Sequence, residues 1–397
     1  MADIVDAKTQ PPFRGDEREL EIYKRGLVGS RISVPASLSL LEQKAREILS
    51  GRAWDYVAGG AGGEDTIRAN REAFDRWKLV PRMLRDVAER DMSIELLGTK
   101  LPAPVLLGPV GVQGIVHPDA EVAVAKAAAS LGLPMVLSTV CSKPMEDVSK
   151  ALDGSPAWFQ LYWTKDPELT ASFLARAQAA GFRALVVTLD IPMLGWRERD
   201  LQHPYLPFLI GEGVANYICD PVFRSRLAKP PEEDPLAAIQ HWGTIFANPR
   251  LTWSDLPFLR DHTTLPILLK GVLHPEDASR AIEAGIDGLI VSNHGGRQVD
   301  GAIASLDALP AIVDVVKGRV PVLFDSGIRR GADAVKALAL GANAVLLGRL
   351  YLWGLAVAGS QGVRDVVLNF LSDLDICLAL CGFTSLRGLN PSMLVRS

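Results

Sequence analysis

The sequence has 397 residues, 48% of them hydrophobic, and a formal net charge of −4. This slightly acidic balance argues against nucleic acid as a partner, and no apolar run approaches the roughly 18 residues that a membrane-spanning helix needs. The N-terminus lacks the apolar core of a signal peptide and the four cysteines lack the spacing of a zinc site, so we expect a cytoplasmic protein without a metal.

The beginning of the chain predicts a helical cap over residues 1–75, followed by a barrel over residues 76–397 within one domain that spans residues 1–397. Ser39 and Glu42 have the spacing of a capping box in front of the helix that contains LLEQKAREIL. We therefore expect that helix to begin near Ser39.

Beyond residue 100, one pattern recurs: an alanine-rich helix end, a glycine and an apolar, β-branched strand. It is found in AAASLGLPMVLST, AQAAGFRALVVTLD, AIEAGIDGLIVSN and ALALGANAVLLGR. A glycine there suits a helix C-cap because it adopts the left-handed conformation at low cost. Continuous apolar strands are typical of a parallel sheet that is buried on both faces. The expected strands are Val105–Val110, Met135–Thr139, Ala157–Leu161, Ala184–Leu189, Pro266–Lys270, Gly288–Ser292, Pro321–Asp325 and Ala344–Gly348.

Eight alternating strand–helix units predict an α/β fold of the (β/α)8 TIM-barrel type. An open, doubly wound sheet is the alternative. The sequence contains no G-x-G-x-x-G after a strand, no G-x-x-x-x-G-K-[ST], no H-E-x-x-H and no G-x-S-x-G.

About sixty residues, 195–252, separate the fourth and fifth strands, and loops of this length are usually functional lids or disordered segments. The acidic tract PPEEDP argues against a membrane-docking segment, so we predict a lid. The aromatic residues that distinguish this loop from a plain linker include Trp196, Tyr205, Phe208, Tyr217, Phe223 and Trp242.

Polar residues occupy the carboxyl ends of the predicted strands, where the active sites of such barrels lie. Isolated polar residues at strand ends can simply meet solvent. Seven strand ends of this kind, with a lysine, a histidine and two carboxylates among them, favour a catalytic site. The residues are Ser138, Gln160 with Tyr162, Thr188 with Asp190, Lys270, Ser292 with His294, Asp325, and Arg349 just beyond Gly348.

The loops after the seventh and eighth strands, FDSGIRRGAD and LLGRLYLWG, predict a phosphate site. Gly327 and Gly348 allow backbone amides to approach an anion, and Arg329 or Arg330 with Arg349 can donate bidentate hydrogen bonds. The alternative is a solvated arginine pair, but cations at a helix start oppose the helix dipole, which favours a bound anion. A phosphorylated cofactor or substrate fits this pattern.

Several stretches, namely SNHGGRQVDG, LLKGV, FDSGIRRGADAVKALALGA, FQLYWTKD and VTLDIPMLGWRERD, resemble the FMN-dependent 2-hydroxy-acid oxidases and dehydrogenases. The resemblance extends from about residue 40 to 390. It implies FMN as cofactor and a small 2-hydroxy acid as substrate. The segments YLPFLIGEGVANY and GWRERDL most resemble the lactate 2-monooxygenase branch, which couples lactate oxidation to decarboxylation and yields acetate, carbon dioxide and water.

The resemblance implies that His294 is the base that takes a proton from the hydroxy acid and that Arg297 binds its carboxylate. An imidazole titrates near neutrality, and Asp190 can hold its tautomer and stabilise its charged form. The two intervening glycines let the chain turn so that both side chains face one ligand. By the same resemblance, Tyr56 shares the substrate carboxylate with Arg297, and Tyr162 lies near the substrate hydroxyl. Arg197 matches a further active-site arginine.

The flavin contacts are likewise implied by the resemblance. Lys270 matches the lysine beside flavin N1, where negative charge develops on reduction. Contacts of the ring and ribityl chain are assigned to Ser138, Gln160, Thr188 and Ser292. Ribityl and phosphate contacts are assigned to Asp325, Arg329, Gly348 and Arg349. Pro109, Gly111 and Ser326 complete the expected cofactor site.

The sequence departs from the family pattern at four positions. Val140 stands where many oxidases have an aromatic residue, Trp196 replaces a frequent arginine and Ser326 replaces a frequent glycine. Gly111 stands where many members have alanine and lactate monooxygenase has glycine. Because Gly111 has no Cβ atom, it lets the backbone approach closely or leaves a methyl-sized gap. Such a gap can retain peroxide beside the keto acid. The alternative is that Gly111 only permits a turn.

We therefore expect oxidation of an L-2-hydroxy acid, lactate, by O2 with coupled decarboxylation. An L-2-hydroxy-acid oxidase that releases 2-keto acid and hydrogen peroxide is the nearest alternative. A phosphosugar isomerase or synthase is an alternative of a different class, and a noncatalytic barrel is a third. His294, Arg297 and Tyr56 together favour an unphosphorylated carboxylate. The resemblance also implies a homotetramer or homo-octamer.

Overall fold

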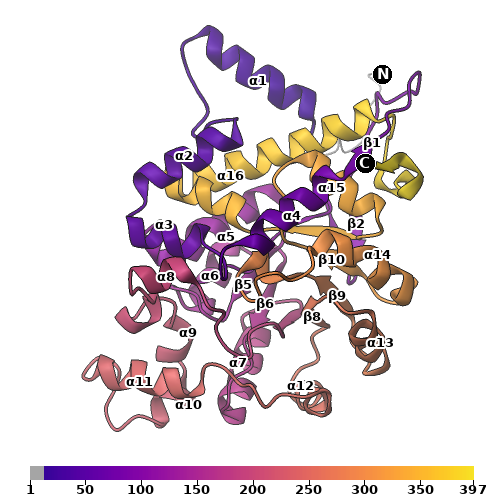
Figure 1. The fold of residues 1–397 in the computed structure, drawn as a ribbon. Coiled ribbons are helices and arrows are strands. Elements are labelled where there is room, and N and C mark those ends of the chain that lie inside the picture. Colours follow the sequence, from indigo (N-terminus) through magenta and orange to yellow (C-terminus); the bar gives the residue numbers. More distant parts are fainter. Residues whose placement is uncertain (1–12) are drawn as a thin grey trace, which may run out of the picture.

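The computed structural model describes residues 13–397 (Figure 1). Eight parallel strands form a closed barrel in chain order, and β11 pairs with β4 to close it. Each strand overlaps one of the eight predicted stretches, which confirms the (β/α)8 barrel. The strands are β4 (Val105–Leu107), β5 (Met135–Ser138), β6 (Ala157–Leu161), β7 (Leu185–Thr188), β8 (Ile267–Val272), β9 (Gly288–Val291), β10 (Val322–Phe324) and β11 (Ala344–Leu347).

Helices pack around the outside of the barrel between successive strands. The glycines of the recurring pattern have left-handed φ angles of +63° to +105°, as predicted for helix ends, and are Gly132, Gly181, Gly285 and Gly341. None of the helices in the described part of the chain combines the length and apolar character that crossing a bilayer requires. The outer helices are α5 (Ala120–Leu131), α6 (Met145–Leu152), α7 (Pro167–Ala179), α12 (Leu256–His262), α13 (Pro275–Glu283), α14 (Ser305–Val316), α15 (Gly331–Ala339) and α16 (Arg349–Leu380).

The interior of the barrel is closed at the amino-terminal ends of its strands. A hairpin of β2 (Ile94–Leu96) and β3 (Thr99–Leu101) places Leu96 and Leu101 in one buried cluster with side chains from inside the barrel, among them Ala184 and Ala344 at the strand starts. Because this end is filled with apolar side chains, a ligand pocket is left to the opposite, carboxyl end of the strands.

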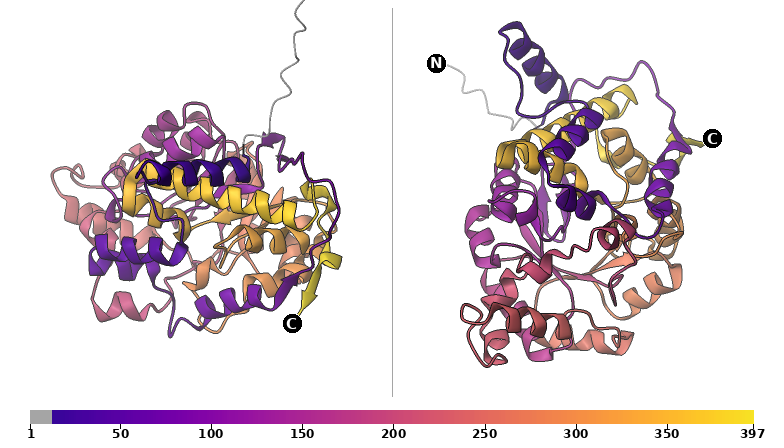
Figure 2. Two further views of the ribbon diagram at one scale, coloured as in Figure 1. Left: turned by 90° about the horizontal axis from the view of Figure 1, so that it is seen from above. Right: turned by 60° about the vertical axis from the view of Figure 1, so that its left-hand side comes forward.

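The N-terminal region contributes α1 (Gly15–Leu27), α2 (Leu38–Ile48), α3 (Gly51–Ala58) and α4 (Asp65–Asp75). Helix α1 runs alongside α16 (Figure 2), where Arg18 forms a 3.0 Å ion pair with Asp365. The predicted capping box is wrong. Ser37 has the extended backbone of an N-cap, so Ser39 already lies inside α2. Strand β1 (Trp77–Leu79) pairs with β12 (Leu394–Arg396) near the C-terminus.

The 195–252 segment, predicted as a lid, is built from short helices rather than open loop: α8 (Glu198–Gln202), α9 (Ala215–Ile218), α10 (Pro221–Ser225) and α11 (Pro235–Ile245). Most of its aromatic residues are buried and pack together, with Trp242 at 4.7 Å from both Phe208 and Phe246 between ring centroids. Trp196 is exposed and Tyr205 is only partly buried.

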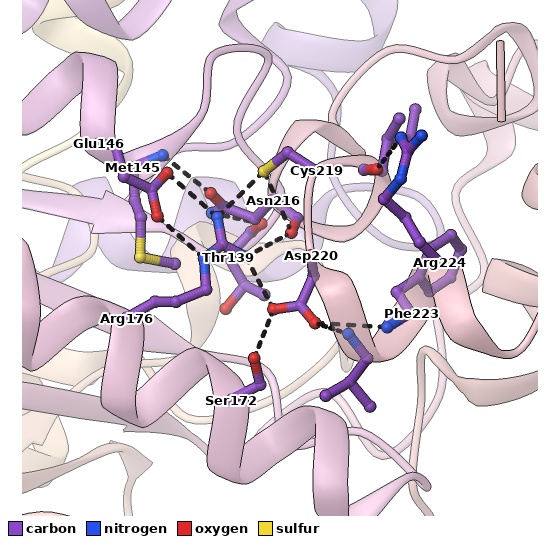
Figure 3. A network of polar contacts seen from close by, with 12 residues as sticks. Thr139, Met145, Glu146, Ser172, Arg176, Asn216, Cys219, Asp220, Phe223 and Arg224 are labelled. Carbon is purple, nitrogen blue, oxygen red and sulfur yellow. Dashed lines mark hydrogen bonds and ion pairs between the residues drawn. The ribbon is translucent and has the colours of Figure 1, made fainter. Parts of the chain in front are cut away.

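A buried polar network fastens this segment to the barrel helices (Figure 3). The carboxylate of Asp220, which is fully buried, accepts hydrogen bonds from Ser172 and Arg176 of α7, both at 2.8 Å. Arg176 also pairs with Glu146 of α6 at 2.9 Å. Asn216 donates a 3.2 Å hydrogen bond to the carbonyl of Thr139, directly after β5. The segment is therefore fixed to two helices and to the end of a barrel strand.

Candidate active site

The loop after β9 makes a left-handed turn around a histidine. Residues His294, Gly295 and Gly296 have φ angles of +59°, +66° and +75°. A Cβ atom on Gly295 would lie 2.9 Å from Nη1 of Arg349, and one on Gly296 would lie 2.8 Å from the backbone nitrogen of Ile67. Both glycines are thus required by backbone angle and by space. A histidine in this region is strained, which is typical of a functional position.

The imidazole of His294 is held by a carboxylate from the end of β7, two strands away in the barrel. Its Nδ1 lies 2.8 Å from Oδ1 of Asp190. Since a carboxylate only accepts, Nδ1 carries the proton and Nε2 is left as the acceptor. Burial lowers the pKa of His294 below its usual value, although Asp190 opposes this shift. Burial alone would raise the pKa of Asp190, but the interaction with His294 outweighs it and lowers that pKa. The arrangement provides a neutral, oriented base.

The same pocket is lined by two tyrosines, Tyr56 and Tyr162, and by Arg197 and Arg297 among its arginines. The Arg297 guanidinium lies 5.1 Å from the ring centre of Tyr56 and donates to the carbonyls of Tyr56 and Gly59 at 2.6 and 2.7 Å. Burial, with Arg197 nearby, lowers the pKa of Arg297 to about 10. Burial raises the pKa of Tyr162, so its phenol remains a hydrogen-bond donor. Such a pocket favours a small anion that carries a polar group next to its charged group.

Lys270 is a buried cation near the carboxyl end of β8. Its Nζ atom lies 3.1 Å from Oδ2 of Asp325 and donates to Oγ of Ser292 at 2.9 Å. Burial alone would lower its pKa, but Asp325 and Asp190 outweigh burial and raise it. Lys270 therefore keeps its charge inside the pocket.

The loops after β10 and β11 gather cations that lack anionic partners. Arg349 donates its hydrogen bonds to three main-chain carbonyls, those of Val57, Gly59 and Gly295, at 2.8 to 3.0 Å, and no carboxylate of the described residues pairs with it. Burial, followed by the charges of Arg297 and Arg329, lowers the pKa of Arg349. A pocket with this excess of positive charge is built for an anion.

The loop after β10 carries the serine that departs from the family pattern. Ser326 and Gly327 have φ angles of +82° and +93°, the region that favours glycine. Ser326 compensates with its hydroxyl, which donates to Oδ1 of Asp325 at 2.8 Å and accepts from the amide of Gly295 at 3.0 Å. The substitution therefore links the loops after β9 and β10.

Comparisons with known proteins place this arrangement in a family. The model of the FMN-dependent dehydrogenase family matches residues 45–396. The L-lactate oxidase of Lysinibacillus sphaericus is 47% identical over 363 residues, 91% of this chain and 93% of that protein. The FMN-dependent alpha-hydroxy acid dehydrogenase qulF of Penicillium citrinum is 45% identical over 390 residues, 97% of each chain. A crystal structure of mandelate oxidase has a TM-score of 0.81 at 38% identity, with 91% of this chain and 98% of that chain covered.

The chain belongs to the FMN-dependent 2-hydroxy-acid oxidase family. FMN is its cofactor, and it is an oxidoreductase that oxidises a 2-hydroxy acid. When bound, FMN accepts the electron pair that leaves the substrate.

The residues of this family member fit FMN. Among the described residues, Nε2 of Gln160 is a buried donor without a partner, while its Oε1 atom accepts from Ser138 at 3.0 Å. A flavin carbonyl would satisfy that donor. We propose that Arg349, Arg329 and the loop at Gly327 hold the phosphate and that Lys270 faces the ring.

The structure brings most of the sequence-predicted residues to one pocket at the carboxyl ends of the strands. Arg330 does not line it, so Arg329 is the arginine of that pair that does. Five predicted residues lie outside the lining: Ser138, Gln160, Asp190 and Ser292 stand behind it, and Thr188 lines an adjoining cavity. Those that line the pocket are Tyr56, Pro109, Gly111, Tyr162, Arg197, Lys270, His294, Arg297, Asp325, Ser326, Gly327, Arg329, Gly348 and Arg349.

Three amide side chains that support the site were missed from the sequence. Asn70 of α4 and Asn293 exchange hydrogen bonds at 2.9 and 2.7 Å and so tie the histidine loop to the N-terminal helices. Gln298 donates to the carbonyl of Asp190 at 2.7 Å and accepts from Arg197 at 3.2 Å. Gln298 directly follows the GGR motif, which is a usable signal, but nothing in the sequence around Asn70 distinguishes it.

The structure shows the close approach predicted for Gly111 and no methyl-sized gap. A Cβ atom there would lie 2.5 Å from Cγ2 and 2.6 Å from the carbonyl oxygen of Val140. The amide of Val112 donates to the same carbonyl at 2.8 Å. Gly111 therefore allows two neighbouring loops to pack together, and this packing positions Val140 in the pocket wall.

Proposed function

We propose that this enzyme oxidises L-lactate with O2 and decarboxylates the keto acid before it leaves, so that acetate, carbon dioxide and water are the products. The observation that carries the proposal is the oriented His294–Asp190 pair in the same pocket as Arg297 and Tyr56. Arg297 and Tyr56 bind the substrate carboxylate, and Nε2 of His294 accepts the substrate proton. Arg197 adds a second cation, and the phenol of Tyr162 donates to the hydroxyl side.

The residues that close the pocket favour a substrate with a short apolar side chain. These residues leave no charged or hydrogen-bonding group for a larger polar side chain, and the methyl group of lactate needs none. The similarity to an L-lactate oxidase points in the same direction. The apolar lining residues from the loops after β5 and β7 are Val140, Ile191, Leu194, Phe208 and Phe246.

Decarboxylation requires that both products of oxidation stay together. Lactate and O2 give pyruvate and hydrogen peroxide, and these two give acetate, carbon dioxide and water. The proposal is supported by the 195–252 segment, which contributes Arg197, Phe208 and Phe246 to the pocket lining and is anchored by Asp220. A fixed wall of this kind slows escape of peroxide.

The oxidase alternative differs only in the fate of the keto acid. The test is anaerobic bleaching of the bound flavin with a panel of L-2-hydroxy acids, followed by product analysis in air without catalase. The proposal predicts fastest bleaching with lactate, acetate as the main product and little free peroxide. Stoichiometric pyruvate and peroxide would make the enzyme an oxidase, and absence of bleaching with every hydroxy acid would refute both functions.

A further inference from the structure

A second cavity of about 240 Å3 adjoins the active-site pocket. The two share three lining residues, Tyr162, Ile191 and Phe246, which form the partition between them. Away from this partition, the second cavity is lined by apolar side chains together with four polar residues, Thr188, Asn248, Thr252 and Asp277. It is larger than the roughly 150 Å3 that accommodate a benzene ring in an apolar protein cavity. The apolar side chains include Trp163, Leu251, Trp253, Leu256 and Leu269.

Phe246 is the partition residue that can be changed with the least disturbance of the proposed catalytic groups. Tyr162 belongs to the proposed substrate site, and Ile191 is bonded to Asp190 in the chain. The ring of Phe246 is 6% exposed and meets the ring of Tyr162 edge-on, with 5.5 Å between centroids. It also packs against Phe208 and Trp242 at 5.9 and 4.7 Å. The Phe246 ring is thus held in place by Tyr162 on one side and by Phe208 and Trp242 on the other.

We infer that Phe246 is a specificity-determining residue: it closes the second cavity, and its removal opens that cavity as a subsite for the alkyl or aryl chain of larger L-2-hydroxy acids. The inference rests on the proposed function, because it concerns the side chain of that substrate. Each buried methylene of a longer substrate contributes about fourfold to kcat/KM. A substrate three carbons longer than lactate can gain up to about 60-fold from such a subsite.

The test compares kcat/KM for L-lactate, L-2-hydroxyhexanoate and L-mandelate in the flavin-loaded parent, Phe246→Ala and Phe246→Leu. The expected result is at least a tenfold rise in the hydroxyhexanoate-to-lactate ratio for Phe246→Ala, and a smaller rise for Phe246→Leu. The leucine variant keeps more of the apolar volume of Phe246 than the alanine variant does, so it provides the result if the alanine variant loses flavin.

Two controls separate an opened subsite from a loosened wall. Phe208 contacts the same aromatic cluster but lines only the active-site pocket, so Phe208→Ala should not raise the ratio. Leu251 lines only the second cavity and is partly buried, so Leu251→Trp should leave lactate turnover unchanged. In the double variant Phe246→Ala/Leu251→Trp, the filled cavity should remove the gain.

An unchanged ratio in both Phe246 variants, with flavin bound, overturns the inference, as does an equal gain in Phe208→Ala or a gain that survives the Leu251→Trp substitution. Failure of the parent to reduce its flavin with any 2-hydroxy acid would instead overturn the proposed function.

Discussion

The Nδ1 atom of His294 lies 2.8 Å from Oδ1 of Asp190, and this contact joins the loops that follow β9 and β7. The second oxygen of Asp190 is buried without a hydrogen-bond partner among the described residues. The carboxylate therefore acts on the imidazole through one oxygen. It fixes the ring and favours its protonated form without making the resting histidine a cation.

Substitution of Asp190→Asn should lower the plateau of the kcat/KM pH profile and move its acidic limb to lower pH. The direction follows from the sign of the interaction: Asp190 raises the pKa of His294, so its loss lowers that pKa further below the usual value. The amide also permits the wrong imidazole tautomer, and we expect a loss of about 10²-fold in rate. Steady-state rates measured from acid to neutral pH test this, and a limb that moves to higher pH would contradict it.

Substitution of Arg349→Met should weaken FMN binding roughly 10- to 150-fold, because a hydrogen bond to a charged partner contributes roughly 1.5–3 kcal/mol. Titration of apoprotein with FMN, followed by flavin fluorescence, provides the affinity. The matched control is Arg330→Met, which removes the same charge from a residue outside the pocket lining. Equal FMN affinities in the two variants would rule out Arg349 as a phosphate ligand.

Substitution of Gly111→Ala should displace Val140, because the added Cβ atom would overlap both its side chain and its carbonyl oxygen. We expect a loss of about 1–3 kcal/mol in the free energy of unfolding, together with more pyruvate and peroxide and less acetate. Gly243→Ala is the control, since nothing lies within 4 Å of a Cβ atom there. Unfolding by urea and the acetate-to-pyruvate ratio test both parts, and an unchanged ratio in a destabilised Gly111 variant would leave Gly111 as a packing residue only.

Substitution of Asp220→Ala should release the 195–252 segment from α7 while leaving the flavin-side residues in place. The expected outcome is a normal rate of anaerobic flavin reduction but a several-fold higher yield of free peroxide. Glu232→Ala is the control on the same segment, because its ion pair with Arg224 is exposed and contributes little. If peroxide release is the same in both variants, the anchored segment does not retain the products.

The fold could be predicted because the strand–helix repeat is local. Four of the strands follow a helix end and a glycine such as Gly181 within a few residues, so the sequence alone specifies that unit. The predicted site residues converge for the same reason, since barrel geometry brings the carboxyl ends of all eight strands to one face. Asp190 and His294 lie 104 residues apart and still meet.

What could not be predicted depends on distances between loops. Gly111 and Val140 lie on adjacent loops, and only the structure shows that no methyl group fits between them. The Asn70–Asn293 pair joins a helix to a loop 223 residues away, and no periodic pattern in the sequence indicates such a contact. The capping error at Ser39 arose because Ser37 and Ser39 are both suitable caps, and the backbone conformation decides between them.

The central claim is that His294 is the base in a flavin-dependent oxidation of L-lactate. It is tested most directly by stopped-flow anaerobic reduction of the flavin in the parent enzyme and in His294→Gln, with FMN content measured in both. We predict that the variant retains its FMN and is reduced by lactate roughly 10²- to 10⁴-fold more slowly than the parent, the usual contribution of a general base. Reduction of the FMN-loaded variant at a rate near that of the parent would contradict the account.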